Sequence, residues 1–249
     1  MHSLTGKTMA VVGGSRGVGR KIVEAGILNG ARVLAVARDQ AGLTQLAENI
    51  PGIEIKALDA TDEAAPASVF SVFKPDVLVI AAGAFPPAAR LHEQSWQQFA
   101  VNWESGVKIA FHFLRAALST PLAPGSTVVL ISSGAALAGS PNSGGYAGAK
   151  RTQLFMANYS QKESDRLGLD LRFLALAPRM MPDTDLGQHA IAGYSRYLGI
   201  STSDFIKSIA APPTSSDVAA AVIDLATRPN RPKESVFVVT GTDLQAVAA

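Results

Sequence analysis

The chain has 249 residues and a net charge of +2, and a composition of 47% hydrophobic and 17% charged residues excludes intrinsic disorder. Basic residues are interleaved with acidic ones, so neither nucleic acid nor a membrane is indicated as a partner. The absence of cysteine excludes disulfides, thiolate metal sites and cysteine nucleophiles. The N-terminus lacks an apolar signal region, and no apolar run approaches the roughly 18 residues of a membrane span. We therefore expect a soluble, cytoplasmic protein.

Short apolar runs rich in Val, Ile and Leu recur along the chain, separated by longer helix-like stretches. Several runs are unbroken rather than alternating, which is typical of strands buried on both faces of a parallel sheet. Strands are predicted at 8–12, 32–37, 53–58, 76–81, 126–131, 171–177 and 235–240. Helices are predicted at 18–29, 40–49, 62–72, 95–118, 146–167 and 215–227. This alternation predicts an α/β fold: a doubly wound parallel sheet (Rossmann fold) of about seven strands flanked by helices.

No linker, low-complexity tract or internal repeat divides the chain, so residues 1–249 are predicted to form a single domain. The stretch 178–213 breaks the strand–helix alternation with polar, glycine and aromatic residues. A loop of that length in a compact domain is usually functional. We therefore predict a substrate-binding loop there.

A glycine-rich loop, "GGSRGVGR", follows the first predicted strand and opens the first predicted helix. Glycines in this position let backbone N–H groups approach a pyrophosphate at the helix N-terminus, where the helix dipole is positive. The pattern favours a dinucleotide site over a plain tight turn, because it lies in the first βαβ unit of a doubly wound sheet.

The end of the second predicted strand bears on the choice of nucleotide. Ala37 stands where an acidic residue would accept hydrogen bonds from a free ribose 2′-hydroxyl, and Arg38 follows it. Together with Arg16 of the glycine loop, Arg38 offers guanidinium groups that suit a 2′-phosphate. These residues favour NADP(H), whereas Asp39, one position further on, keeps an NAD site open.

A serine pair and a tyrosine–lysine pair come later in the chain. Ser132 and Ser133 end the predicted strand 126–131, Tyr146 follows Ser133 by thirteen residues, and Lys150 lies on the same helical face as Tyr146. Because ligands bind at the carboxyl ends of strands in such sheets, these side chains are expected to converge on one crevice.

With this pattern the chain resembles the short-chain dehydrogenase/reductase family over nearly its whole length. The matching pieces are "GGSRGVG", "DATD" at 59–62, "VNWESG" at 101–106, "ISS" at 131–133 and "YAGAK" at 146–150. The resemblance implies a catalytic tetrad of Asn102, Ser133, Tyr146 and Lys150. It also implies an adenine contact at Asp59, which has the alternative role of capping the helix that follows.

The predicted site residues fall into two further sets. The cofactor-binding set is Gly13, Ser15, Arg16, Gly17, Val18, Gly19, Arg38, Asp59, Ala60, Ala82, Gly83, Tyr146, Lys150 and Pro178. The substrate-binding set is Ser133, Tyr146 and Met180.

Each member of the tetrad suits the transfer of a hydride to a carbonyl. The negative charge that develops on oxygen needs a proton donor and a hydrogen-bond donor, here Tyr146 and Ser133. A Lys150 ammonium, with a cationic nicotinamide, is expected to lower the pKa of the phenol. By family resemblance, Asn102 anchors a water that links Lys150 to solvent.

The chain departs from the family pattern in three places. Where many family members have Asn-Asn-Ala-Gly, this chain has "IAAG" at 80–83. Where they have Pro-Gly after the sixth strand, it has "PRM" at 178–180. Arg179 stands where the family usually has a glycine that allows close approach. Thr184 falls one place later than the family threonine that contacts the carboxamide. Both differences affect the expected nicotinamide contacts. The C-terminus also lacks the frequent Asp-Gly-Gly ending.

The pocket walls and the substrate follow from side-chain types. Candidate walls are Phe85, Leu137, Met180, Met181, Tyr194 and Tyr197, each of which is equally suited to the core. These side chains favour a small, uncharged and fairly apolar carbonyl or alcohol. His92 and His189 stand alone, so no metal site is predicted.

The leading hypothesis is an NADP(H)-dependent oxidoreductase that interconverts a carbonyl and an alcohol. The alternatives are an NAD-linked alcohol dehydrogenase and a non-catalytic NADP(H)-sensing regulatory protein, against which the complete tetrad argues. Excess apolar residues on the helices predicted at 95–118 and 146–167, together with the family resemblance, predict a homodimer or homotetramer.

Overall fold

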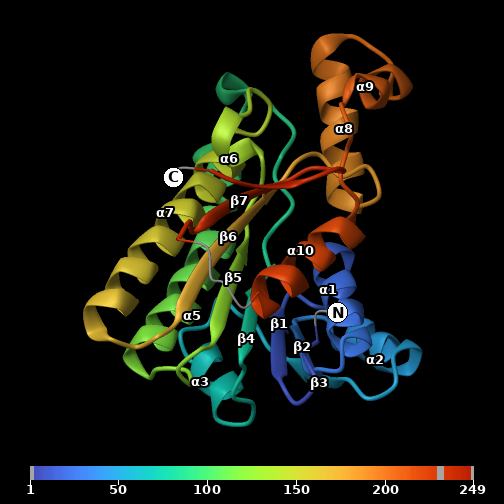
Figure 1. The fold of residues 1–249 in the computed structure, drawn as a ribbon. Helices are drawn as coiled ribbons and strands as arrows, with labels where there is room; N and C mark the ends of the chain where they lie inside the picture. The colour runs from blue at the N-terminus through green and yellow to red at the C-terminus, as the bar shows by residue number, and fades with distance from the viewer. Residues whose placement is uncertain (1–2, 229–232, 248–249) are drawn as a thin grey trace.

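The computed structural model describes residues 3–228 and 233–247, in which one sheet lies between two layers of helices (Figure 1). Within these residues the sheet has eight strands in the order β3-β2-β1-β4-β5-β6-β7-β8. The strands are β1 Thr8–Val12, β2 Arg32–Ala37, β3 Glu54–Ala57, β4 Val77–Ile80, β5 Thr127–Ile131, β6 Arg172–Pro178, β7 Val236–Val239 and β8 Leu244–Ala246.

The predicted doubly wound sheet is confirmed. Strands β1 to β7 pair in parallel, and the strand order reverses direction between β1 and β4. This reversal is the switch point outside which such sheets bind ligands. The antiparallel β8 was not predicted, because its three residues, Leu244–Ala246, are short and largely exposed and carry no apolar run.

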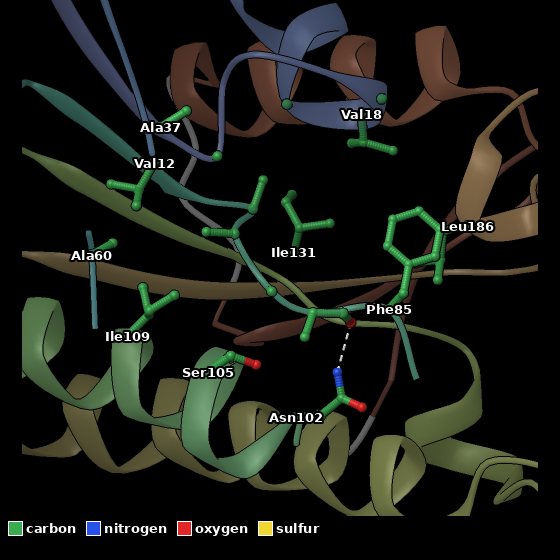
Figure 2. A pocket seen from close by; sticks show the side chains of 18 of the residues that line it. Val12, Val18, Ala37, Ala60, Phe85, Asn102, Ser105, Ile109, Ile131 and Leu186 are labelled. Carbon is green, nitrogen blue, oxygen red and sulfur yellow. Dashed lines mark hydrogen bonds between the residues drawn. The ribbon is translucent and has the colours of Figure 1, made fainter. Parts of the chain in front are cut away.

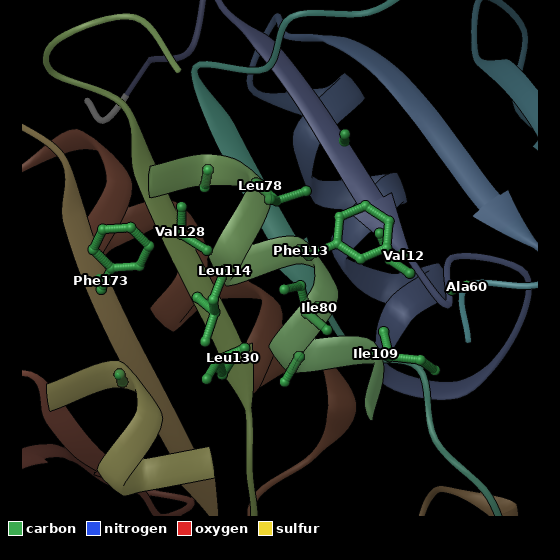
Figure 3. Close-up of a cluster of buried hydrophobic side chains, with 14 of the residues drawn as sticks. Val12, Ala60, Leu78, Ile80, Ile109, Phe113, Leu114, Val128, Leu130 and Phe173 are labelled. Carbon is green, nitrogen blue, oxygen red and sulfur yellow. The ribbon is translucent and has the colours of Figure 1, made fainter. Parts of the chain in front are cut away.

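The strands separate two hydrophobic cores. In β4, Val77 and Val79 belong to one core, and Leu78 and Ile80 belong to the other. Both faces of the sheet are therefore buried, which explains the unbroken apolar runs of the sequence. Figure 3 shows the second core, in which Phe113 packs among side chains of the sheet.

Two layers of helices cover these cores. One layer consists of α1, α2 and α10, and the other of α3, α5 and α7 (Figure 1). The α-helices are α1 Gly17–Leu28, α2 Gln40–Asn49, α3 Ala65–Phe70, α4 Trp96–Ala100, α5 Lys108–Ser119, α6 Ala135–Ala138, α7 Gly144–Leu167, α8 Asp185–Leu198, α9 Thr202–Ser208 and α10 Ser215–Thr227. Two other helical turns are the 3₁₀-helix η1 Leu91–Glu93 and the π-helix η2 Trp103–Val107. No helix of the described residues is long and apolar enough to cross a membrane.

The helix predicted at 95–118 is wrong as one continuous element. It consists of α4, the π-helix η2 and α5, and in η2 the N–H of Val107 donates to the carbonyl of Asn102 at 3.2 Å. Trp103 also ties this turn to α7, because its indole N–H donates to the carbonyl of Gly145 at 3.2 Å. A tertiary contact thus accompanies the interruption, which hydrophobic periodicity does not reveal.

The stretch predicted as a loop at 178–213 is mostly helical. It contains α8 and α9, which stand beside the sheet above α10 in Figure 1. Other predicted elements are shorter than expected: β3 spans Glu54–Ala57, α3 spans Ala65–Phe70, and β4 and β7 are each two residues shorter than predicted.

Candidate active site

The glycine-rich loop brings the N-terminus of α1 to the carboxyl ends of the strands. Gly13 has φ +92°, and a β-carbon there would lie 2.6 Å from the backbone nitrogen of Ala82. A β-carbon on Gly19 would collide with the carbonyl oxygen of Gly13. These close contacts hold the loop between β4 and α1, so that both positions require glycine.

A cleft of about 920 Å³ runs along this edge of the sheet (Figure 2). It is lined by every residue of the predicted catalytic and cofactor-binding sets except Pro178. Pro178 is buried in β6, and its carbonyl accepts a hydrogen bond from the N–H of Gly134 at 2.7 Å. The structure therefore brings together all the predicted residues of these two sets but one.

Exposed charges line one end of the cleft, beside β2 and β3. The guanidinium of Arg38 lies 3.9 Å from the carboxylate of Asp59, and the two side chains are 73% and 50% exposed. Asp59 also accepts hydrogen bonds from the N–H and hydroxyl of Thr61 at 2.9 and 2.8 Å, which lower the pKa of its carboxyl. Asp59 thus makes a local turn and lines the cleft as well.

Arg16 lies over an aromatic ring. Its guanidinium is 5.1 Å from the centroid of Phe85, and that ring meets His189 edge-on at 6.0 Å. The glycine loop is thereby linked across the cleft to α8. Phe85, a predicted substrate wall, lines this larger cleft beside the glycine loop.

The opposite end of the cleft, at β5 and α7, is tightly hydrogen bonded. Ser133 and Tyr146 both line this end, and the Ser133 hydroxyl acts to lower the pKa of the Tyr146 phenol. The ammonium of Lys150 donates to the carbonyl of Ile131 at 2.7 Å and to Oε1 of Gln153 at 3.1 Å, and it lies 5.7 Å from the Tyr146 ring centroid. The hydroxyl of Ser132 donates to the carbonyl of Lys150 at 2.8 Å. These bonds join the end of β5 to the face of α7 that carries the tyrosine and lysine.

Burial controls the ionisation of both groups. It raises the pKa of the Tyr146 phenol, and the Ser133 hydroxyl offsets part of that rise. Burial also lowers the pKa of Lys150 to about 8. Loss of hydration dominates the pKa of the phenol in this structure, and the lowering expected from Lys150 together with a cationic nicotinamide stays a prediction.

Asn102 occupies the turn between α4 and η2. Its side-chain N–H donates to the carbonyl of Ala84 at 2.7 Å, drawn as the dashed line in Figure 2, and the residue is 4% exposed. Its Oδ1 is buried and accepts no hydrogen bond from the described residues. The side chain is thus held at one end and retains an acceptor at the other.

A second cavity of about 500 Å³ lies under α8 and α9. Both cavities are lined by Ser133, Tyr146, Met181, Thr184 and Leu186. The walls of the second cavity are mainly apolar and include Leu137, Met180, Met181, Tyr194 and Phe205. Four of the six predicted pocket walls are therefore found here.

The remaining predicted wall, Tyr197, lines neither cavity. Its ring is 39% exposed and lies 5.6 Å under the guanidinium of Arg90. Tyr194 points inward instead and stacks on Phe205 at 5.6 Å. Both tyrosines lie on α8, and only Tyr194 lies on the face of that helix that lines the cavity. A predicted loop has no such faces, so the sequence prediction could not separate them.

The departures from the family pattern surround the junction of the two cavities. Arg179 lines the smaller cavity and packs beside Gly134. Thr184 caps α8, since its hydroxyl accepts from the N–H of Gly187 at 3.0 Å and donates to the carbonyl of Met181 at 3.1 Å. Three residues of "IAAG" at 80–83 line the larger cleft, namely Ala81, Ala82 and Gly83.

Sequence reasoning missed Gln153, a polar residue that lines the larger cleft beside Lys150. It stands three positions after Lys150, so it shares the helical face of that lysine. A polar side chain on that inward face was the available signal. No comparable signal in the sequence indicated its partner, the carbonyl of Gly106 in the π-helix η2.

Comparison with known proteins agrees with this arrangement. The profile of the short chain dehydrogenase family matches residues 7–194, and the chain belongs to the short-chain dehydrogenase/reductase family. It is 34% identical to an L-xylulose reductase of Bos taurus over 151 residues, or 59% of this chain and 61% of the relative. It is 32% identical to an L-fucose dehydrogenase of Rattus norvegicus over 119 residues, or 46% and 44%. The chain thus spans less than two thirds of these curated relatives.

A solved structure resembles the whole fold. The short-chain dehydrogenase/reductase SDR:Glucose/ribitol dehydrogenase from Brucella melitensis matches with a TM-score of 0.78 over 97% of this chain and 98% of that one. The sequence identity is 20%, so this likeness concerns the fold.

Proposed function

We propose that the protein is an NADP(H)-dependent oxidoreductase that interconverts a carbonyl and an alcohol. The observation that carries this proposal is the meeting of Ser133, Tyr146 and Lys150 at the larger cleft, with Ser133 and Tyr146 also facing a second, apolar cavity. A nucleotide in the first cavity and a carbonyl compound in the second would meet at these hydroxyls.

Each residue of this junction has a chemical task. When bound, the nicotinamide nucleotide supplies or accepts the hydride. The phenol of Tyr146 donates a proton to the nascent alkoxide in reduction and accepts one in oxidation. The hydroxyl of Ser133 donates a hydrogen bond to the same oxygen, and the ammonium of Lys150 stabilises the phenolate. The free acceptor of Asn102 fits the proposed role of holding a water on the proton path.

The cradle suits a dinucleotide phosphate. The first turn of α1 offers backbone N–H groups without helical acceptors, next to glycines that hold the loop close. Arg16 and Arg38 line the same cleft and are the proposed partners of a 2′-phosphate. Asp39 lines it too and is the basis of the alternative NAD preference, although its carboxylate lies against Gly42 of α2.

The second cavity suits a small, uncharged and fairly apolar substrate. Leu137, Met180, Met181, Phe205 and Ile209 supply apolar walls, and its size is that of a small-molecule pocket. The named relatives act on sugars, as their names state. The apolar walls favour a ketone, aldehyde or alcohol with fewer hydroxyls than a sugar.

A turnover screen tests this function. Purified protein is mixed with NADPH or NADH and a panel of aliphatic ketones, aromatic ketones and ketose sugars, and consumption of the reduced nucleotide is followed by absorbance. We expect turnover of an apolar carbonyl, with NADPH preferred. Binding of NADPH without turnover of any carbonyl or alcohol would instead support a sensing protein.

We also propose that the protein self-associates through α5 and α7. Large side chains on this side of the molecule are exposed, including Phe111 at 49% and Tyr159 at 58%. Phe155 and Tyr159 stack on each other at 6.3 Å. Light scattering is expected to give a dimer or tetramer, and Tyr159→Glu is expected to shift it towards monomer.

A further inference from the structure

Gln153 is a buried amide with both ends occupied. It is 2% exposed, on α7, and lines the larger cleft beside Lys150. Its Oε1 accepts a hydrogen bond from the Lys150 ammonium at 3.1 Å, and its Nε2 donates one to the carbonyl of Gly106 in η2 at 3.0 Å. A buried amide satisfied in this way links the lysine to the π-helix.

The direction of the amide is fixed by its partners. An ammonium and a carbonyl leave one possible assignment, because the lysine only donates and Gly106 oxygen only accepts. Exchanging the oxygen and nitrogen of Gln153 would oppose like groups at both ends. Among the residues that the structure describes, the glutamine therefore presents its acceptor to Lys150 alone.

The ammonium has three N–H donors, and two are engaged in the structure. Ile131 oxygen takes one at 2.7 Å and Gln153 oxygen takes another. These two acceptors fix the orientation of the ammonium, so the third donor has a defined direction. The Tyr146 ring, with its centroid 5.7 Å away, lies within reach of the charge.

We propose that Gln153 is a positioning residue for the reaction: it holds the Lys150 ammonium toward Tyr146 and keeps it charged. This inference rests on the proposed function for its meaning in catalysis. The contacts that carry it do not depend on the identity of the substrate.

The charge around Lys150 makes this acceptor important. Tyr146 on α7 is a neutral phenol, and β5 presents the neutral carbonyl of Ile131. Glu104 of η2 and Asp59 line the same cleft, but burial is the cause of the lowered pKa of Lys150. Neutral oxygens therefore stabilise the ammonium, and removing one of the two weakens that stabilisation.

Two substitutions separate positioning from packing. Gln153→Met has a similar length and no hydrogen-bonding capacity, and it should lower the pKa of Lys150 by about one unit, the size of one charge-assisted hydrogen bond. Gln153→Glu keeps an acceptor and adds a negative charge, so it should raise that pKa by about one unit or more. Opposite shifts are expected, whereas a role in packing alone predicts no shift or shifts of one sign.

The control is Ser164→Ala. Ser164 is also buried on α7, and its hydroxyl donates to the carbonyl of Leu171 at 3.0 Å, far along the helix from Lys150. This variant should lower the melting temperature and leave the pKa of Lys150 unchanged. It thus reports what loss of a buried hydrogen bond does to α7 alone.

The measurement is the pH titration of the Lys150 side-chain ¹³Cε signal by NMR, assigned with Lys150→Met. It needs no substrate, so failure to find turnover would remove the proposed function and leave this test intact. In parallel, the pH at which alcohol oxidation is half-maximal should move upward by about one unit in Gln153→Met. Unchanged Lys150 titration in both Gln153 variants overturns the inference, even if the wild-type protein reduces carbonyls.

Discussion

The two ends of the large cleft are built differently. At the end near β2 and β3, Arg38 and Asp59 are largely exposed and approach each other at 3.9 Å. At the end near β5 and α7, the part-buried Lys150 makes hydrogen bonds of 2.7 and 3.1 Å. There a β-carbon on Gly145 would collide with the carbonyl of Phe99, so α4 and α7 touch through their backbones.

This difference indicates which property each end controls. Exposed charges are screened by water and salt, so they discriminate between ligands at small energetic cost. Buried groups interact through a medium of lower dielectric, where the loss of one partner has a larger effect. We therefore expect substitutions at the β5–α7 end to change the rate and those at the β2–β3 end to change nucleotide preference.

The largest effect is expected for Tyr146→Phe. Only the hydroxyl is removed, and a positioned acid or base contributes roughly 10²–10⁴-fold in rate. The variant should bind NADPH as the wild type does and lose turnover by that factor. Fluorescence titration with NADPH and steady-state kinetics measure the two properties. A kcat near the wild-type value would show that the reaction does not use this phenol.

The next effect concerns Arg38. Because a hydrogen bond to a charged group contributes about 1.5–3 kcal/mol, Arg38→Ala should lower kcat/KM for NADPH roughly ten- to a hundred-fold and leave NADH nearly unchanged. Ala37→Asp combined with Arg38→Ala should move the preference towards NADH. Equal kcat/KM for both nucleotides in the wild type would contradict the assignment and favour Asp39 as the ribose partner.

A smaller effect is expected from salt. The Debye length falls from about 10 Å at 0.1 M to about 3 Å at 1 M ionic strength, so the preference for NADPH should fall several-fold over that range. The rate ratio between wild type and Tyr146→Phe should stay constant over the same range. If the nucleotide preference and the Tyr146→Phe rate ratio changed equally with salt, the two ends of the cleft would not differ in screening.

The smallest effect is expected for Asp59→Ala. The substitution removes the hydrogen bonds from Thr61 as well as an exposed ion pair that contributes at most about 1 kcal/mol, so the free energy of unfolding should fall by about 1–2 kcal/mol at neutral pH. Because the folded state lowers the pKa of Asp59 below 3.8, this contribution is complete above that pH and is lost as the pH falls through the lower, folded value. Urea unfolding at neutral and acidic pH measures it, and a larger loss at neutral pH would show that Asp59 supports the fold.

The sequence predicted the sheet well because its strands are buried on both faces. Unbroken apolar runs identified β1 to β7, and the fold then located Ser133 and Tyr146 at a common edge. The π-helix was not predictable in this way, because its apolar spacing continues from α4 into α5. Its presence depends on contacts with α7, such as the bond from Trp103 to Gly145.

The substrate side was predicted less well for a related reason. The glycines, histidine and tyrosines of 178–213 indicate a loop, but Thr184 and Ser201 cap two helices there. Their inward faces, and hence the different positions of Tyr194 and Tyr197, depend on packing. The role of Gln153 also depends on packing. Its amide oxygen bonds to Lys150 on the same helix, but its amide nitrogen bonds to Gly106, which is 47 residues away in the sequence.

The wall shared by the two cavities also bears on inhibition. Ser133 and Tyr146 line both spaces, so a single elongated compound that passes their hydroxyls can occupy both at once. Once one half of such a compound is bound, the other half is held at a high effective concentration beside its own cavity. Linking a nucleotide-site fragment to an apolar fragment is thus a route to tight ligands that does not require knowledge of the natural substrate.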